Sequence, residues 1–220
     1  MKRRTFAALM VVLFVVAFAT MAMGATVKQL QKQSSKYWKT EQFQKCYDTY
    51  MELIKKDPKQ ATWYLYLAGN CKIHMNKVNE SFPLYLDALK NHPDCENTQK
   101  DSNHTNIMST LGEFAAYEGR PDIILEAVEY YGSKRYNVNK HVYRAWHAGH
   151  FCDSTALGKT KVKDIMTYYL ALAYYNAGDK AKAKETLEAR AEFMNGYVSL
   201  DKRDCPKLED EVPALLAKCN

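Results

Sequence analysis

The chain has 220 residues and a net charge of +6, with 31 basic and 25 acidic side chains. This length fits one domain of ordinary size with a continuous core. The sequence contains no run of five like charges that would suggest a nucleic-acid or membrane patch. The modest basic excess is typical of a solvated surface, and nucleic-acid binding is not expected.

Residues 1–24 have the pattern of an export signal. Three basic residues come first, an apolar run extends from Phe6 to Ala19, and Ala22-Met23-Gly24 forms a small-x-small cleavage pattern. An apolar run of 14 residues is shorter than the roughly 20 that a membrane-spanning helix needs. We therefore expect cleavage before Ala25, with an uncleaved membrane anchor as the alternative. The mature chain is expected in the periplasm or outside the cell, with no membrane span of its own.

Cysteine usage agrees with export. Six cysteines follow the signal, and an even number in an oxidising compartment predicts up to three disulfides. They are Cys46, Cys71, Cys95, Cys152, Cys205 and Cys219. No two form C-x-x-C, the spacing of zinc ribbons, thioredoxin-like sites and haem attachment. Asn79 and Asn103 begin N-x-[S/T] triplets, which matter for glycosylation only in a eukaryotic source.

The chain after the signal has helical patterning. Between Thr26 and Ala127, apolar and aromatic residues recur at steps of three and four, as in amphipathic helices, and the alternation of strands is missing. Turn-forming residues separate segments of helical length. These turns are Asp57-Pro58, His92-Pro93, Glu118-Gly119 and Ala177-Gly178-Asp179. The sequence thus predicts an all-α chain built of short helix pairs.

Four units of this chain resemble the tetratricopeptide repeat, a helical hairpin of about 34 residues with the pattern W-x2-L-G-x2-Y, then A-x3-F, then P. The matching residues, unit by unit, are Tyr37, Cys46, Tyr50 and Pro58; Ala68, Gly69, Lys72, Ser81, Tyr85 and Pro93; Leu111, Gly112, Ala115, Gly119 and Ile124; and Leu170, Ala171, Tyr174, Gly178, Asp179, Ala183 and Leu187. The tryptophan of the pattern is absent, since its positions hold Leu30, Leu65, Met108 and Thr167. Another helical-hairpin repeat is the alternative.

The resemblance implies a helical-hairpin solenoid over residues 25–196. Spacings between matching positions place insertions near residues 94–104 and 130–161, the second long enough for an extra helix through His141 to Ala148. Small residues such as Gly69 and Gly112 suit the close approach of two helices. Residues 197–220 are expected to form a tail with a short helix from about Pro213 to Lys218.

The resemblance also implies a concave groove lined by first helices, where tyrosine provides a flat contact area and a hydroxyl group. The candidate groove residues are Tyr66, Asn70, His74, Glu113, Tyr117, Tyr168 and Tyr175. Filling of the gaps between helix pairs is the competing role for these tyrosines. Gln31 and Ser35 stand where a receptor for peptide C-termini would offer asparagine and lysine, which disfavours that class of partner.

Repeat geometry suggests the disulfide pairing. Cys46 occupies a small inward-facing position of the first unit, and Cys71 lies two residues beyond Gly69, so a Cys46–Cys71 bridge is expected where adjacent helices touch. Cys205–Cys219 would pin the tail, and Cys95–Cys152 would tie the two insertions together. Six cysteines allow 15 connectivities, so other pairings stay open.

Signals for catalysis are weak. His147, His150 and Asp153 would share one side of a helix and could hold zinc, but Gly149 indicates a helix end and the glutamate of the zinc-protease helix is missing. The main hypothesis is a secreted or periplasmic scaffold that binds a protein or peptide and has no cofactor or enzymatic activity. In variants of this hypothesis the protein is a subunit of an envelope or surface assembly, or assembles with itself. The alternative is a metal-binding protein or metal-dependent enzyme centred on those three residues.

Overall fold

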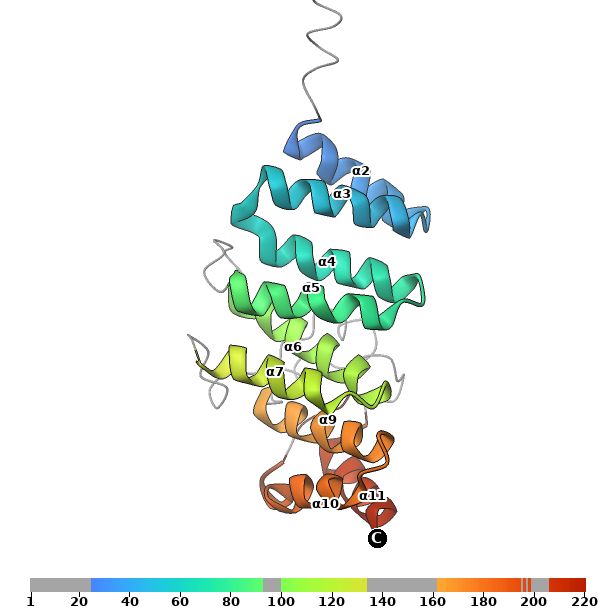
Figure 1. Cartoon of the computed structure of the whole chain (residues 1–220), viewed down its shortest axis with the longest axis vertical. Helices are drawn as coiled ribbons and strands as arrows, with labels where there is room; N and C mark the ends of the chain where they lie inside the picture. The colour runs from blue at the N-terminus through green and yellow to red at the C-terminus, as the bar shows by residue number, and fades with distance from the viewer. Residues whose placement is uncertain (1–24, 93–99, 134–161, 195, 197, 199–205) are drawn as a thin grey trace, which may run out of the picture.

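The computed structural model describes residues 25–92, 100–133, 162–194, 196, 198 and 206–220, and all regular structure in these residues is helical. The helices follow one another along the longest axis of the molecule, from α2 at one end to α10 and α11 at the other (Figure 1). The α-helices are α2 (Val27–Lys39), α3 (Phe43–Lys56), α4 (Ala61–His74), α5 (Val78–Asn91), α6 (Lys100–Tyr117), α7 (Pro121–Ser133), α9 (Val162–Asn176), α10 (Lys180–Glu188) and α11 (Leu208–Cys219). Two short 3-10 helices are η1 (Pro58–Gln60) and η3 (Ala191–Phe193).

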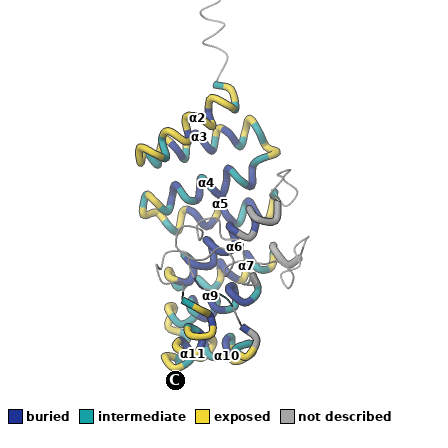
Figure 2. The backbone as a smooth tube through the Cα atoms, turned by 180° about the vertical axis from the view of Figure 1, so that it is seen from behind, coloured by how far each residue is buried: buried dark blue, intermediate teal, exposed yellow. Residues whose placement is uncertain are grey.

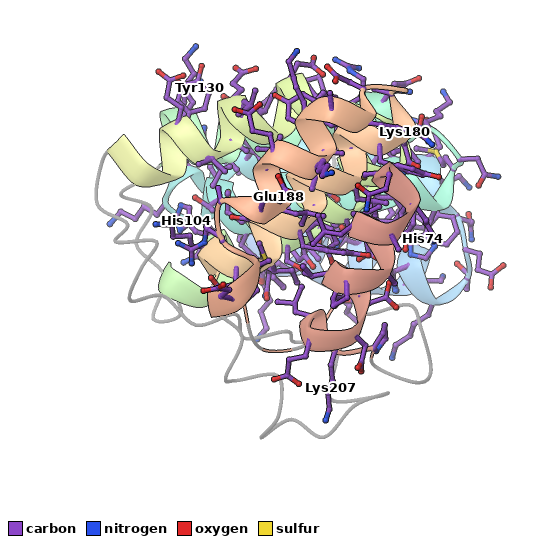
Figure 3. The ribbon with its side chains drawn as sticks, turned by 90° about the horizontal axis from the view of Figure 1, so that it is seen from below. His74, His104, Tyr130, Lys180, Glu188 and Lys207 are labelled. Carbon is purple, nitrogen blue, oxygen red and sulfur yellow. The ribbon has the colours of Figure 1, made fainter. Side chains whose placement is uncertain are left out.

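The helices form the pairs α2/α3, α4/α5, α6/α7 and α9/α10, in which each member packs on its neighbour. This arrangement confirms the all-α prediction and is consistent with a helical-repeat fold. The predicted breaks fall between helices, because α3 ends at Lys56, α5 at Asn91, α6 at Tyr117 and α9 at Asn176. Seen from the α10/α11 end, His74 and Lys180 lie on one side of the stack and His104 and Tyr130 on the other (Figure 3).

A capping box starts the first helix. The Thr26 hydroxyl accepts a hydrogen bond from the Gln29 backbone N–H at 3.3 Å, and the Gln29 side chain accepts one from the Thr26 N–H at 2.8 Å. These bonds satisfy N–H groups that a helix start leaves without intrahelical partners. Leu30 and Ser34 then form the buried face of α2 against α3 and α4.

Two glycines permit the closest helix contacts. A Cβ atom on Gly69 of α4 would lie 2.3 Å from Cε1 of Tyr85 on α5, and one on Gly112 of α6 would lie 2.8 Å from Sδ of Met166 on α9. Real Cβ atoms essentially never come this close to another heavy atom. Gly69 matches the prediction that small residues let the two helices of one pair approach, whereas Gly112 permits contact with α9 of the next pair.

The turn between α6 and α7 lies against the turn between α9 and α10. Gly119 has a φ of +63°, a backbone conformation that suits glycine, and a Cβ there would lie 3.1 Å from the Ala177 nitrogen. The Asn176 side chain donates a hydrogen bond of 2.8 Å to the Ala116 carbonyl. Segments about sixty residues apart in sequence are therefore neighbours.

The described core has two apolar clusters along the stack. The smaller joins α2, α3 and α4 through Leu30, Leu53 and Tyr64, and the larger runs from α4 to α11. Ile54, Trp63, Leu67 and Leu84 are half-buried and pack against both clusters. Buried positions accordingly recur in the described helices from α2 to α11 (Figure 2). No helix in the described ranges has the length and apolar character needed to cross a membrane.

The structure differs from the predicted insertions at their edges. The loop expected around Asp94 to Asn103 is helical from Lys100 onward, and α7 continues to Ser133 although an insertion was expected from residue 130. His104, Ile107 and Met108 are buried, so the start of α6 continues the pattern of inward-facing residues. The extra helix expected from His141 to Ala148 lies outside the described residues.

The predicted tail also differs, because it is part of the fold. The Val198 N–H donates to the Pro206 carbonyl at 2.8 Å, and the Leu208 N–H donates to the Gly196 carbonyl at 2.9 Å. The helix begins at Leu208 rather than near Pro213. Pro213 lies inside the helix, because buried Leu208 and Val212 extend it by an earlier turn that packs with α9 and α10.

Candidate binding surface

Three of the predicted groove residues are buried. Tyr66 is 2% exposed, Glu113 5% and Tyr168 5%. The Tyr66 ring lies 6.1 Å from that of Tyr85, and the Asn70 and Thr110 side chains lie near its hydroxyl. Burial raises the pKa of Tyr66. In this conformation these side chains fill the gaps between helices and do not line an open surface.

The tail helix covers one of the predicted groove positions on α9, that of Tyr168. The Tyr168 hydroxyl on α9 donates a hydrogen bond of 3.1 Å to Oε2 of Glu211 on α11. Burial and the neighbouring Glu211 carboxylate raise the pKa of this tyrosine. This contact was not predicted, because the tail was expected to be separate from the repeats. Tyr168 therefore anchors α11 and is inaccessible to a partner.

Asn70 lies between the interior and the surface. Its Oδ1 accepts a hydrogen bond of 2.7 Å from the Tyr85 hydroxyl, so it joins α4 to α5. The side chain is half-buried. Asn70 positions the Tyr85 ring beside Gly69 and offers only part of its surface to a ligand.

The remaining predicted residues lie near the ends of first helices. His74 is the last residue of α4, Tyr117 the last residue of α6, and Tyr175 the second-to-last residue of α9. Tyr117 is 52% exposed, His74 is exposed and Tyr175 is half-buried. The Lys180 ammonium lies 5.8 Å from the centre of the Tyr175 ring. The accessible aromatic groups thus follow the edge of the stack where the hairpin turns lie.

Two further aromatic residues, which the sequence analysis did not select, extend this edge at the first hairpin. The His74 ring stacks on Phe43 with a centroid distance of 4.8 Å and meets Trp38 edge-on at 4.9 Å. Trp38 and Phe43 stand on either side of the α2–α3 turn, and this placement in the sequence could have indicated that they lie close together. We call Trp38, Phe43, His74, Tyr117 and Tyr175 the aromatic edge. Rings of this kind provide large, rigid contact areas with little loss of side-chain entropy.

A buried lysine occupies the tyrosine position of the second repeat. The Lys72 Nζ atom lies 2.7 Å from Oε2 of Glu80 and 4.1 Å from the centre of the Tyr47 ring. Its side chain is only 11% exposed. The hydrogen bond from Lys72 lowers the pKa of Glu80. This group joins α3, α4 and α5 and is structural.

Cys46 and Cys71 lie side by side in the interior, as predicted, but as free thiols. The Cys46 thiol also lies 3.4 Å from the Ser34 carbonyl oxygen, to which it can donate. Hydrogen bonding from Cys71 lowers the pKa of Cys46, and the same contact together with burial raises the pKa of Cys71. The predicted bridge is therefore not formed in this structure. Cys219 is a free, half-buried thiol, and Cys95, Cys152 and Cys205 lie outside the described residues.

The alternative of a metal centre receives no support. In the part of the chain that the structure describes, no three histidine, cysteine or acidic side chains could hold a metal ion together. His147, His150 and Asp153, the residues of that hypothesis, lie outside this part.

Comparison with known proteins supports the repeat assignment. A family model described as the tetratricopeptide repeat matches residues 166–189. This span contains most of α9 and all of α10, the unit identified from Leu170, Ala171 and Ala183. No curated protein and no solved structure gives a significant match. The match supports a tetratricopeptide-like family, and such repeats generally serve as scaffolds for protein–protein interaction and not as catalysts.

Proposed function

We propose that this protein is an exported helical-repeat scaffold, a solenoid of tetratricopeptide-like hairpins, that binds a protein or peptide along the aromatic edge. The observation that carries the proposal is the exposure of Tyr117 and His74 at the ends of α6 and α4. Protein-binding sites favour aromatic side chains that can be covered on contact. The repeat match at residues 166–189 supports the general class of function.

The buried tyrosines have a separate role in this proposal. Tyr66 and Tyr168 hold successive helices in register, through contacts with Thr110 and Glu211. The aromatic edge is therefore held in place by packed helices and does not depend on a mobile loop. A rigid arrangement of aromatic groups reduces the entropy lost on binding. The export signal would place this scaffold in the periplasm or extracellular space, where a subunit of an envelope or surface assembly is a suitable role.

The test compares two exposed hydrophobic residues of similar size. Tyr117 on α6 is 52% exposed, and Leu125 on α7 is 48% exposed. The partner is first captured with the mature chain from the exported fraction of the source organism, and its affinity is then measured by calorimetry. We expect Tyr117→Ala to weaken binding by about 1–2 kcal/mol, as truncation at an interface does, while Leu125→Ala leaves affinity unchanged.

Helicity and thermal stability of both variants serve as the folding control. Equal losses of affinity, or none in either variant, would remove the aromatic edge from the binding site. Replacement of the buried Tyr66 by Ala should instead lower the stability of the fold, by about 3–5 kcal/mol.

A further inference from the structure

The outward face of α2 carries a row of four exposed lysines, Lys28, Lys32, Lys36 and Lys39, which we call the lysine row. Their spacings of four, four and three residues place them on one side of a helix with 3.6 residues per turn. Between Lys28 and Lys39 the helix advances about 16 Å, at 1.5 Å per residue. The row is therefore long, straight and confined to a narrow strip.

The lysine row lies opposite the packed face of α2. Leu30 and Ser34 are buried, and Tyr37 and Trp38 are half-buried on the side toward α3 and α4. Because α2 forms one end of the stack (Figure 1), the row is directed away from the rest of the described molecule. Exposed positions recur along α2 (Figure 2).

The charges of the row are not balanced by described neighbours. The helix contains no acidic residue, and within the described ranges none of the four lysines forms an ion pair. Other lysines of the chain do have such partners, as in Lys72–Glu80 and Lys182–Asp179. Like charges four residues apart destabilise a helix slightly, so an anionic surface that covered the row would relieve a repulsion present in the free protein.

The composition of α2 disfavours a protein as that partner. Every exposed residue of the helix is lysine, glutamine or serine, with no exposed aliphatic or aromatic side chain. Stable protein interfaces have an apolar or aromatic centre and are depleted in lysine. A row of flexible point charges instead suits a plane of phosphate groups, which requires little geometric matching.

The position of α2 in the chain indicates which phosphate surface is involved. The apolar segment Phe6–Ala19, which is expected to enter the membrane during export, ends only seven residues before α2 begins. We infer that the lysine row docks α2 on the anionic phospholipid headgroups of a membrane surface. This inference rests on the export part of the proposed function and is independent of the aromatic edge.

The test measures binding of the chain from Ala25 onward, which holds every described helix, to phospholipid vesicles. One set contains one part phosphatidylglycerol to two parts phosphatidylcholine, and the other contains phosphatidylcholine alone. We expect sedimentation with the anionic vesicles only, and release in 0.5 M salt because screening weakens the attraction. Each surface lysine strengthens such binding about fivefold, so Lys32→Gln with Lys36→Gln should weaken it on the order of tenfold or more.

A matched control removes two charges at the other end of the stack, by Lys207→Gln just before α11 and Lys218→Gln in the last turn of α11. This variant should bind anionic vesicles like the unaltered chain. Equal weakening in both double variants would reduce the effect to net charge and overturn the inference. Binding to phosphatidylcholine alone, or lysine-row binding to duplex DNA as tight as to anionic vesicles, would also overturn it. The Tyr117→Ala variant should lose partner binding and keep vesicle binding, because the two surfaces are separate. Failure to bind anionic vesicles with intact partner binding would overturn this inference and leave the scaffold proposal standing.

Discussion

At the scale of single residues, Gly69 shows how one missing side chain sets a helix contact. Any Cβ at this position meets the ring of Tyr85, which is fully buried and fixed by its hydrogen bond to Asn70. The ring cannot swing toward solvent, so an added methyl group must displace α4 from α5. The identity of this residue therefore controls the spacing of the whole hairpin.

We predict that Gly69→Ala destabilises the protein by about 1–3 kcal/mol, as overpacking of a core does, despite the higher helix propensity of alanine. Urea unfolding measures the change. Gly178→Ala is the control, because no atom lies within 4 Å of its added Cβ and only its φ of +88° opposes the substitution. In the double variant with Tyr85→Leu the cost of Gly69→Ala should shrink, whereas strict additivity would show that the clash is not its cause.

The Lys72–Glu80 ion pair predicts a dependence of stability on pH. Because Lys72 lowers the pKa of Glu80 in the folded state, the pair stabilises the fold above the unfolded pKa of glutamate, about 4.3. This contribution is lost as the pH falls through the lower folded pKa. Glu80→Gln should thus reduce the urea midpoint at pH 7, with the difference from the unaltered chain closing toward pH 3.

Glu192→Gln provides the comparison for this pH series. It removes the same charge from an exposed residue of η3, and its stability should stay parallel to that of the unaltered chain. If Glu80→Gln lowers the urea midpoint by the same amount at pH 7 and at pH 3, the carboxylate charge of Glu80 does not act through Lys72.

At the scale of elements, Cys46 and Cys71 join α3 to α4 within the smaller core cluster. We predict that a small disulfide such as oxidised glutathione converts the two thiols into a bridge, with loss of two protons and transfer of two electrons to the oxidant. The lowered pKa of Cys46 favours its thiolate, the attacking form. Closing this loop should stabilise the fold by about 3 kcal/mol on the chain-entropy estimate, measured by unfolding with and without reductant.

Peptide mapping under non-reducing conditions identifies the pairing, and Cys46→Ser serves as the variant in which stability should not respond to reductant. A peptide joining Cys46 to Cys205 or Cys219 would contradict the order of helices described above. The same mapping tests the two other pairings, Cys95–Cys152 and Cys205–Cys219.

At the scale of the whole molecule, the sequence was sufficient for the all-helical class and for four of the breaks between helices. The turns at Asp57-Pro58 and Glu118-Gly119 could be predicted because proline and glycine have strong local conformational preferences. The tail helix could not be placed, since its start depends on burial of Leu208 against α9 and α10 rather than on its own residues.

The candidate site was predicted less well for a related reason. The resemblance to tetratricopeptide repeats placed Tyr66, Tyr117 and Tyr168 on first helices, but it does not show whether a neighbouring element covers them. Glu211 reaches Tyr168 from a segment 43 residues away in sequence, and Thr110 reaches Tyr66 from the next hairpin. Tyr117 stays exposed because it ends α6 at the edge of the stack.

The contact between the two neighbouring turns has a consequence for how this chain tolerates change. Gly119 lies against Ala177, and Asn176 holds the Ala116 carbonyl, although residues 134–161 lie between them in sequence. The entropic cost of closing a loop rises only slowly with its length, so the interface of α6 with α9 need not depend on how many residues connect α7 to α9. We therefore expect the connection between α7 and α9 to tolerate insertions. It is also where the protein could be divided into two polypeptides that reassemble.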